Sequence, residues 1–188
     1  MLTLMPNIGF FKSLRQLDDD RLSKQRQDAL AALQLLLGPK TKIRHAIMDM
    51  WGGYEYVLGV YGMSACSEWQ NKRGNRDKIA FDIHALLDGL PKEFDVPPWM
   101  GDLDFHRSHR SYLIRKMPEV YEEYWPNTPL NMPLLWPKLT DADPRGYFLR
   151  PSTLGDRQLH SGERELPEWL HYNKLTREVI NLEEEEEQ

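Results

Sequence analysis

The fold is decided by the stretch Leu17-Asp-Asp-Asp-Arg-Leu-Ser-Lys-Gln-Arg-Gln-Asp28, which opens the strongest helix that the chain predicts, over residues 18–37. Its three consecutive aspartates suit the N-cap and the positive end of the helix dipole. Gly38-Pro39 ends the helix, because a proline cannot continue it.

Polar and apolar side chains separate on this helix when successive residues are placed about 100° apart. The polar stripe consists of Arg21, Lys24, Gln25 and Asp28, and the apolar arc consists of Leu22, Ala29, Leu33, Leu36 and Leu37. Arg26 points into the apolar arc, where a charge is costly unless it is paired. Cations around one carboxylate suit a phosphate site beside an acid or base, and they also suit an ordinary solvated helix face.

Helical spacing of apolar residues continues beyond the first helix. We predict helices over residues 43–50, 54–74, 75–87 and 102–117, a short helical turn in 119–125 and a last helix in 167–180. Prolines recur between residues 126 and 151, so this part should wrap over the surface without regular structure. An alternating strand pattern is almost absent. The sequence therefore predicts an all-α fold, a compact helical bundle with a proline-rich, mostly irregular C-terminal extension.

Length and charge indicate the domain organisation. With 188 residues, the chain is long enough for one substantial core. We expect a helical domain at residues 1–137, an extension wrapping that domain at 138–182, and a disordered acidic tail at 183–188. Five of the negative charges come from Glu183 to Glu187, so a net charge of −5 leaves residues 1–182 neutral and compatible with a local basic face.

Cysteine usage and the apolar runs indicate a cytoplasmic protein without a membrane anchor. Cys66 is the only cysteine, which excludes an intramolecular disulfide and a thiolate metal cluster, and we expect it to be buried. The N-terminus lacks the pattern of a signal peptide. No stretch approaches the roughly 20 apolar residues that a membrane span needs.

A second charged cluster lies in the helix predicted over residues 102–117. Its cations are Arg107, Arg110, Arg115 and Lys116. If this helix packs beside the first, both sets of cations form one basic face that binds backbone phosphates without reading sequence. The alternative is that the arginines pair with carboxylates such as Asp102 and Asp104.

The same helix carries His106 and His109, three residues apart on one face. A metal site would need further ligands such as His45, His84 or Glu55, and no metal-binding spacing is present. We therefore predict no metal and no cofactor, and we assign the two histidines to the core or to phosphate contacts.

Glu55 is a further candidate site residue, because it lies between two tyrosines and next to a glycine pair. Tyr54, Tyr56 and their aromatic neighbours suit either stacking on an extruded base or the core.

Four motifs in this order resemble a bacterial and phage family that is grouped with the pyrimidine-dimer DNA glycosylases, the phage endonuclease V class. The resemblance covers roughly residues 8–137. The motifs are Leu17 to Asp28, Met50-Trp-Gly-Gly-Tyr-Glu55, Cys66-Ser-Glu-Trp69 and Pro98-Trp-Met-Gly-Asp-Leu-Asp-Phe-His-Arg-Ser-His-Arg-Ser111.

This resemblance implies a compact all-α enzyme whose N-terminal α-amine attacks the sugar C1′ of a damaged nucleotide. A Schiff base forms, and β-elimination then cuts the strand. The resemblance places the family's helix glutamate at Asp28, with Arg21 and Arg26 among the phosphate-binding positions.

Two departures from the family pattern bear on the chemistry. Asp28 is one methylene shorter than glutamate, which sets its carboxylate back by about 1.5 Å, and errors of about 1 Å can cost a hundredfold in rate. Leu2 is bulky enough to prevent removal of Met1, so the α-amine belongs to Met1 and lies further from the helix than in the family. Lys24 is either a substitute nucleophile or the i,i+4 ion-pair partner of Asp28.

The sequence thus predicts a DNA glycosylase and AP lyase that processes a damaged or modified pyrimidine base in duplex DNA. The alternative is a non-catalytic nucleic-acid-binding or interaction protein on the same scaffold. We expect duplex DNA as the partner, no membrane, and a monomer. The catalytic candidates are Asp28, Met1, Lys24 and Glu55. The candidate DNA contacts are Arg21, Arg26, His106, Arg107, His109, Arg110, Arg115 and Lys116.

Overall fold

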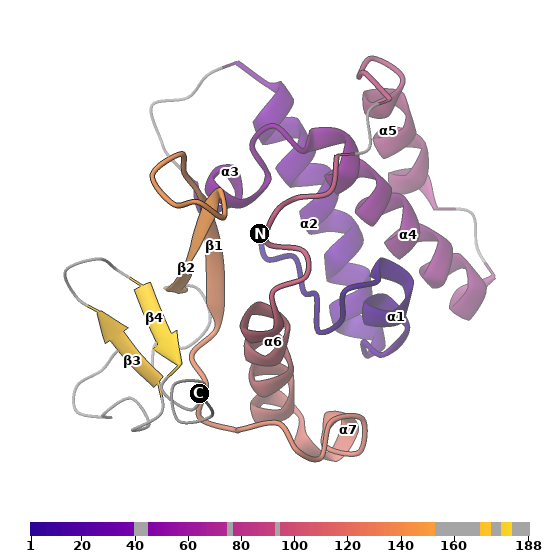
Figure 1. Cartoon of the computed structure of the whole chain (residues 1–188). Coiled ribbons are helices and arrows are strands. Elements are labelled where there is room, and N and C mark those ends of the chain that lie inside the picture. Colours follow the sequence, from indigo (N-terminus) through magenta and orange to yellow (C-terminus); the bar gives the residue numbers. More distant parts are fainter. Residues whose placement is uncertain (40–44, 75–76, 93–94, 153–169, 174–177, 182–188) are drawn as a thin grey trace. The chain divides into compact units, whose positions relative to one another are not determined.

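The computed structural model describes residues 1–39, 45–74, 77–92, 95–152, 170–173 and 178–181. The chain divides into two compact units, Met1–Gly101 and Asp102–Gln188 (Figure 1). The domain boundaries predicted after residues 137 and 182 stay predictions, and the predicted acidic tail lies outside the described residues.

The first unit is built from helices, in agreement with the predicted all-α class. They are α1 (Phe10–Arg15), α2 (Asp19–Leu37), α3 (Ala46–Trp51), α4 (Glu55–Arg73) and α5 (Lys78–Leu87). The two longest, α2 and α4, pack closely because Gly62 has no side chain. A Cβ at Gly62 would lie only 3.0 Å from the Cβ of Ala29 in α2.

Local capping sets the ends of these helices. The side chain of Asp18 accepts a hydrogen bond from the backbone N–H of Arg21 at 3.0 Å, which confirms the predicted N-cap of α2. Gly74 ends α4 with a φ of 69°, a left-handed conformation that favours glycine. The predicted helices in this unit therefore form, with ends shifted by a few residues.

Aromatic side chains fill much of the core of this unit. Trp51 and Trp99 are fully buried with their rings edge to face at 4.9 Å, and Trp99 Nε1 donates to the carbonyl of Met50 at 3.1 Å. Cys66 is buried, as predicted. Burial raises the pKa of its thiol, and the nearby negative charge of Asp77 raises this pKa further. Cys66 is therefore a neutral core thiol.

The second unit combines two helices with two β-hairpins. Its elements are α6 (Leu103–Lys116), α7 (Pro118–Tyr121), β1 (Leu135–Leu139), β2 (Tyr147–Pro151), β3 (Leu170–Asn173) and β4 (Glu178–Asn181). Ser108 joins α6 to β1, because its Oγ accepts from the backbone N–H of Leu135 at 3.1 Å. The hydroxyl of Tyr147 donates to Asp102, the N-cap of α6, at 2.6 Å.

The hairpins depart from the predicted C-terminal part in two places. The antiparallel pair β1–β2 lies in a stretch that we predicted to be irregular. The sequence did not indicate this pair because Pro137 lies within β1, and a proline within an apolar run argues against a strand. The pair β3–β4 shows that the helix predicted over residues 167–180 is wrong at the seven strand positions that it includes. Leu-His-Tyr-Asn and Glu-Val-Ile-Asn contain aromatic and β-branched residues, which favour strands.

No helix in the described part of the chain has both the length and the apolar character needed to cross a membrane.

A buried ion pair ties together three helices of the first unit. Arg26 of α2 donates to the carboxylate of Asp77, and both side chains are less than a tenth exposed. The guanidinium of Arg26 lies 4.2 Å from the ring centroid of Trp69 in α4. Asp77 also caps α5 by accepting from the backbone N–H of Ile79 at 3.1 Å. The arginine that the helical wheel placed among apolar residues is thus paired, as burial of a charge requires.

We predict that Arg26→Ala lowers the free energy of unfolding by about 3–5 kcal/mol, because it leaves Asp77 buried without its counter-charge. Lys78→Ala is the matched control, since Lys78 forms an exposed i,i+4 pair with Asp82 whose loss costs less than about 0.5 kcal/mol. Urea unfolding of both variants measures the difference. Equal small effects would contradict a structural role for Arg26.

Candidate active site

The N-terminal segment lies beside α2 (Figure 1). Two side chains of this helix bind the backbone of the segment. The N–H of Leu2 donates to Asp28 Oδ2 at 3.0 Å, and the N–H of Leu4 donates to Gln25 Oε1 at 2.7 Å. As the chain advances from residue 2 to residue 4, its partners step back one helical turn from residue 28 to residue 25. The segment therefore runs antiparallel to α2, and both hydrogen bonds form in one register.

Helix α4 supports the second of these hydrogen bonds. Tyr61 is fully buried, and its hydroxyl donates to Gln25 Oε1 at 2.6 Å, with the carbonyl oxygen of Leu4 3.1 Å away. Burial raises the pKa of Tyr61, so the hydroxyl keeps its proton and remains a donor. Gln25 is only 2% exposed. Gln25, which binds Leu4, is therefore itself fixed by Tyr61 of α4.

Helix α3 holds the segment between these two points. Trp51 Nε1 donates to Thr3 Oγ1 at 3.1 Å, and Thr3 Oγ1 lies 3.6 Å from the sulfur of Met50. Thr3 is fully buried. Residues from three helices thus fix the chain at positions 2 to 4, through the backbone at 2 and 4 and through the side chain at 3.

Asp28 uses both of its carboxylate oxygens. Oδ2 accepts from Leu2, and Oδ1 lies 3.0 Å from the Nζ of Lys24. The Asp28 side chain is 8% exposed, whereas that of Lys24 is 64% exposed. Because Met1 directly precedes Leu2, the structure brings Met1, Asp28 and Lys24 together, even though Asp28 is shorter than glutamate.

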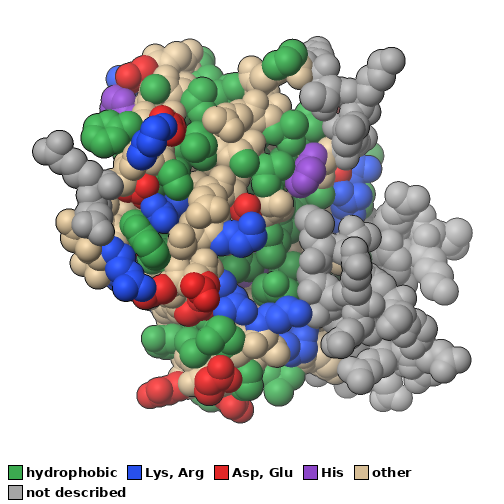
Figure 2. Space-filling model, turned by 180° about the vertical axis from the view of Figure 1, so that it is seen from behind, with side chains coloured by type: hydrophobic (Ala, Val, Ile, Leu, Met, Phe, Trp, Pro, Cys, Tyr) green, Lys and Arg blue, Asp and Glu red, His purple; other side chains and the backbone are tan. Residues whose placement is uncertain are grey.

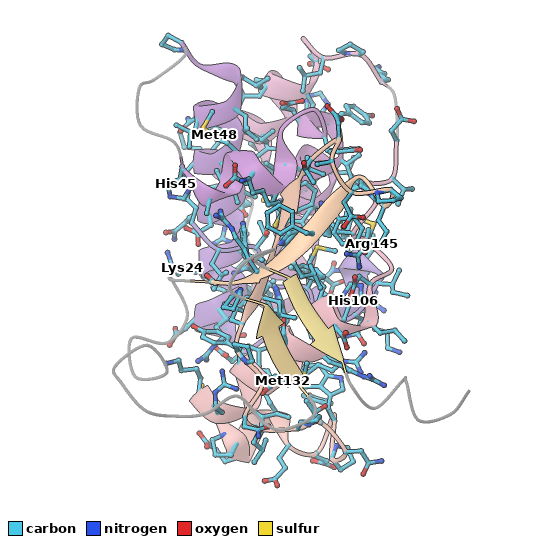
Figure 3. The ribbon with its side chains drawn as sticks, turned by 60° about the vertical axis from the view of Figure 1, so that its left-hand side comes forward. Lys24, His45, Met48, His106, Met132 and Arg145 are labelled. Atoms are coloured by element: carbon cyan, nitrogen blue, oxygen red, sulfur yellow. The ribbon has the colours of Figure 1, made fainter. Side chains whose placement is uncertain are left out.

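His45 is a further member of this group. It caps α3, and its Nδ1 accepts from the backbone N–H of Ile47 at 3.2 Å, which leaves the ring proton on Nε2 in the neutral form. Partial burial and then the positive charge of the α-amine lower the pKa of His45, while the charge of Asp28 opposes them. The ring is therefore neutral at pH 7 and within electrostatic reach of both groups. Figure 3 shows Lys24 and His45 on the same side of the first unit.

Sequence reasoning considered His45 only as a metal ligand. The sequence does contain a signal for its role, because His45 directly precedes an apolar helical run, where an N-cap residue is expected. A ring nitrogen can accept the capping hydrogen bond that a side-chain oxygen usually accepts.

The other predicted residues of the first unit have partners elsewhere. Arg21 binds Asp18 at 2.6 Å, and Arg26 is in the buried pair with Asp77. Glu55 accepts from the N–H of Gly53 at 2.9 Å and lines a pocket of about 130 Å³. Neither Asp28 nor Met1 lines that pocket.

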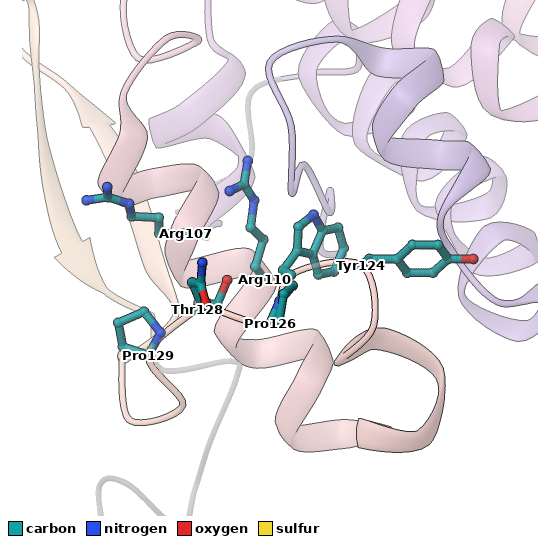
Figure 4. Close-up of a pocket in the computed structure, with 8 residues that line it drawn as sticks. Arg107, Arg110, Tyr124, Pro126, Thr128 and Pro129 are labelled. Carbon is teal, nitrogen blue, oxygen red and sulfur yellow. The ribbon is translucent and has the colours of Figure 1, made fainter.

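Five of the six basic residues of α6 divide into three kinds, and the sixth, Lys116, is exposed at the end of the helix. His106 and His109 are 1% and 0% exposed, so their rings lie inside the unit. Arg115 Nη1 donates at 2.8 Å to the carbonyls of residues 130 and 132, which fixes the chain that leads into β1. Arg107 and Arg110 line a pocket of their own (Figure 4).

Acidic and basic side chains lie next to one another on the face drawn in Figure 2. Within each unit, the structure gives surface pairs of opposite charge, such as Arg73 with Asp19 in the first and Arg145 with Asp143 in the second.

Comparison with known proteins gave one family match. Residues 1–82 match the family model described as pyrimidine dimer DNA glycosylase, which is less than half of the 188 residues. The matched segment contains the N-terminal segment, Lys24, Asp28 and His45. No curated protein matched the chain, and no solved structure did.

We predict that Gln25→Leu releases the N-terminal segment from α2, because it removes the acceptor of the Leu4 N–H at similar side-chain volume. Gln27→Leu on the exposed side of the same helix is the control. Amide hydrogen exchange should show faster exchange at Leu4 in Gln25→Leu only, by tenfold or more. Unchanged protection at Leu4 would contradict the anchoring role of Gln25.

His109 predicts a pH dependence of stability. Burial, and then the charge of His106, lower its pKa to about 3, whereas an unfolded histidine titrates near 6.5. The unfolded state therefore binds a proton first as the pH falls. Its contribution to stability is full above about pH 6.5 and is lost towards pH 3, at up to about 1.4 kcal/mol per pH unit.

Urea unfolding of His109→Gln at several pH values between about 7 and 4 measures this contribution. The variant should lose less stability on acidification than the parent chain does. Parallel pH profiles for the two proteins would show that His109 is not the responsible group.

Proposed function

We propose that this chain, which the match over residues 1–82 groups with the pyrimidine dimer DNA glycosylases, is a DNA glycosylase with AP-lyase activity. It acts on a damaged pyrimidine nucleotide in duplex DNA, with the α-amine of Met1 as nucleophile. The observation that supports this most is the hydrogen bond from Leu2 to Asp28 at 3.0 Å, which holds the start of the chain against a helix carboxylate.

The proposed reaction needs a neutral amine beside a carboxylate. α-Amines as a class are less basic than lysine side chains, so a larger share of them is neutral near pH 7. The amine nitrogen forms a bond to C1′ while the bond from C1′ to the base breaks, and the departing base takes a proton. Opening of the sugar ring gives the Schiff base. Loss of a C2′ proton then expels the 3′ phosphate and cuts the strand.

Asp28 is assigned two tasks in this proposal. As an acid or base it moves protons between the amine and the sugar, and as an anion it stabilises the positive charge that develops on the sugar. Its low exposure strengthens both effects, because charges interact more strongly when water is excluded. His45 adds a neutral ring next to the same groups, with Nε2–H as a donor.

Lys24 is proposed as the electrostatic partner of Asp28. Its Nζ lies at the mostly exposed end of the carboxylate, 3.0 Å from Oδ1. In this position it also offers a positive charge to a DNA phosphate.

DNA contacts are proposed only for basic side chains that reach the surface. On the polar stripe of α2 the candidates are Lys24 and, if it exchanges Asp18 for a phosphate, Arg21. In the second unit they are Arg107, Arg110 and Lys116. Arg26, His106 and His109 are assigned structural roles because they are buried.

Reduction with borohydride tests the proposal on duplexes that carry one pyrimidine dimer or one abasic site. We expect a covalent protein–DNA adduct that maps to Met1. Asp28→Asn should slow turnover about a hundredfold or more, whereas the exposed control Asp20→Asn should not. Lys24→Gln should keep the adduct, and a Gly-Ser extension before Met1 should abolish it.

A non-catalytic DNA-binding protein on the same scaffold gives a different outcome. It would bind duplex DNA with a steep salt dependence and yield neither adduct nor cleaved strand. An adduct that disappears in Lys24→Gln and survives the extension would assign the nucleophile to Lys24 instead.

A further inference from the structure

Helix α5 lies at an edge of the first unit, beside α4 (Figure 1). Its inner side packs tightly on two glycines of α4. A Cβ added to Gly62 would lie 2.8 Å from Cδ1 of Ile83, and one added to Gly59 would collide with the side chain of Leu87. Ile83 is also fully buried. These contacts show which side of α5 faces the core.

The outer side of α5 carries a stripe of four exposed residues. At about 100° per residue they fall within roughly 80° of one another, on the side opposite Ile83. The stripe consists of Lys78, Phe81, Ala85 and Asp88, where Asp88 is the C-cap and keeps a helical backbone. Phe81 is 64% exposed. The steps of three, four and three residues are the spacing along which two helices pack in a coiled coil.

This stripe is complementary to itself when two copies of α5 lie antiparallel. With the helices level at residue 83, Phe81 of each copy faces Ala85 of the other, so a large side chain meets a small one. Lys78 faces Asp88 in the same way, so a cation meets an anion. A two-fold axis repeats every contact, as in an interface between identical chains. A single exposed apolar residue needs no explanation, whereas a self-complementary row of four indicates a contact between helices.

The parallel orientation of the two helices is unfavourable. In a parallel pair each residue of the stripe faces its own copy, so Lys78 meets Lys78 and Asp88 meets Asp88. Like charges at such short range repel each other. The two rings of Phe81 would also meet, while the two small side chains of Ala85 would leave a gap. Charge and size therefore both favour the antiparallel pair.

Asp82 lies beside the stripe and limits the strength of this contact. Because it is one residue from the level of the two-fold axis, it faces Asp82 of the second copy. Within one chain, Lys78 Nζ lies 2.8 Å from Asp82 and His84 Nδ1 lies 3.3 Å from Asp88. Such solvent-exposed pairs contribute little to stability, so Lys78 is available to Asp88 of the second copy. The facing Asp82 residues and a helix only about 15 Å long predict weak association.

We propose that α5 joins two copies of this chain in a weak, antiparallel, two-fold symmetric dimer, in which Phe81 of each copy packs on Ala85 of the other. Aromatic side chains are enriched in the centres of such interfaces. This assembly would replace the monomer that the sequence predicts. The inference is independent of the proposed glycosylase chemistry, because α5 carries none of the residues assigned to that chemistry.

Sedimentation of the full chain at increasing concentration tests this inference. We expect monomers at about 1 µM and a rising share of dimers towards about 300 µM, because an interface of one short helix per copy is small. Phe81→Ser should weaken the dimer at least tenfold, since each copy loses its largest contact. Phe11→Ser is the matched control, because Phe11 of α1 is an exposed phenylalanine of the same unit, and it should change the dissociation constant less than twofold.

Two aspartates of α5 test the orientation of the helices. Asp88→Asn should weaken the dimer about threefold or more, because Lys78 of the second copy loses its counter-charge. Asp82→Asn changes the net charge by the same amount, yet it should leave the dimer equally tight or tighter, because it removes the contact between like charges. In a parallel pair Asp88 would face its own copy, and Asp88→Asn would strengthen the dimer instead.

Three results would overturn the inference. They are a chain that stays monomeric at about 300 µM, equal losses of association in Phe81→Ser and Phe11→Ser, and tighter association in Asp88→Asn. Urea unfolding at about 1 µM, where the chain is monomeric, checks that each variant folds. Since the substituted side chains reach the surface, their replacement should leave the fold of the single chain intact.

Discussion

The hydrogen bonds from the backbone of residues 2 and 4 to Asp28 and Gln25 are the interaction on which the first unit depends. A buried N–H without an acceptor costs about as much as a lost hydrogen bond, so a covered chain end needs acceptors at fixed positions. Helix α2 supplies two of them one turn apart. Both acceptors are side chains of the polar stripe of α2. This part of the stripe is therefore buried against the N-terminal segment. Tyr61 and Thr3 then extend the same network into α4 and α3.

This network explains why a polar face occurs on the inner side of a helix. A buried polar group with only some of its hydrogen bonds destabilises the fold more than an apolar group does. The polar stripe of α2 is therefore stable in the interior only when the N-terminal segment covers it. Asp28 illustrates the balance, since one oxygen holds Leu2 and the other binds Lys24 at the edge of the unit. The carboxylate of Asp28 is therefore mostly buried, whereas its partner Lys24 is mostly exposed at the edge of the unit.

Local patterns in the sequence predicted the helices but not what covers them. The periodicity of α2, the cap at Asp18 and the end at Gly38 are encoded within a few residues. The wheel also showed that Arg26 needs a partner, yet Asp77 lies 51 residues further along the chain. Nothing in Met-Leu-Thr-Leu-Met indicates that its N–H groups bind side chains of α2. From the sequence alone, the polar stripe of α2 could therefore also be a solvent-exposed helix face. Pro137 concealed a strand because a proline within an apolar run argues against one, and its pairing with Leu149 is not visible in the local pattern.

A chain terminus is normally the most mobile part of a domain, which makes it a poor place for a catalytic group. Here the ordering comes from positions 2, 3 and 4, of which α2 binds the first and the last and α3 binds the middle one. None of these three bonds uses the nitrogen of Met1, so the backbone that anchors the segment is distinct from the amine assigned to the chemistry. An amine held in this way loses most of its positional freedom, although its nitrogen takes no part in the three anchoring hydrogen bonds. Precise placement at about the 1 Å level is what the proposed reaction demands.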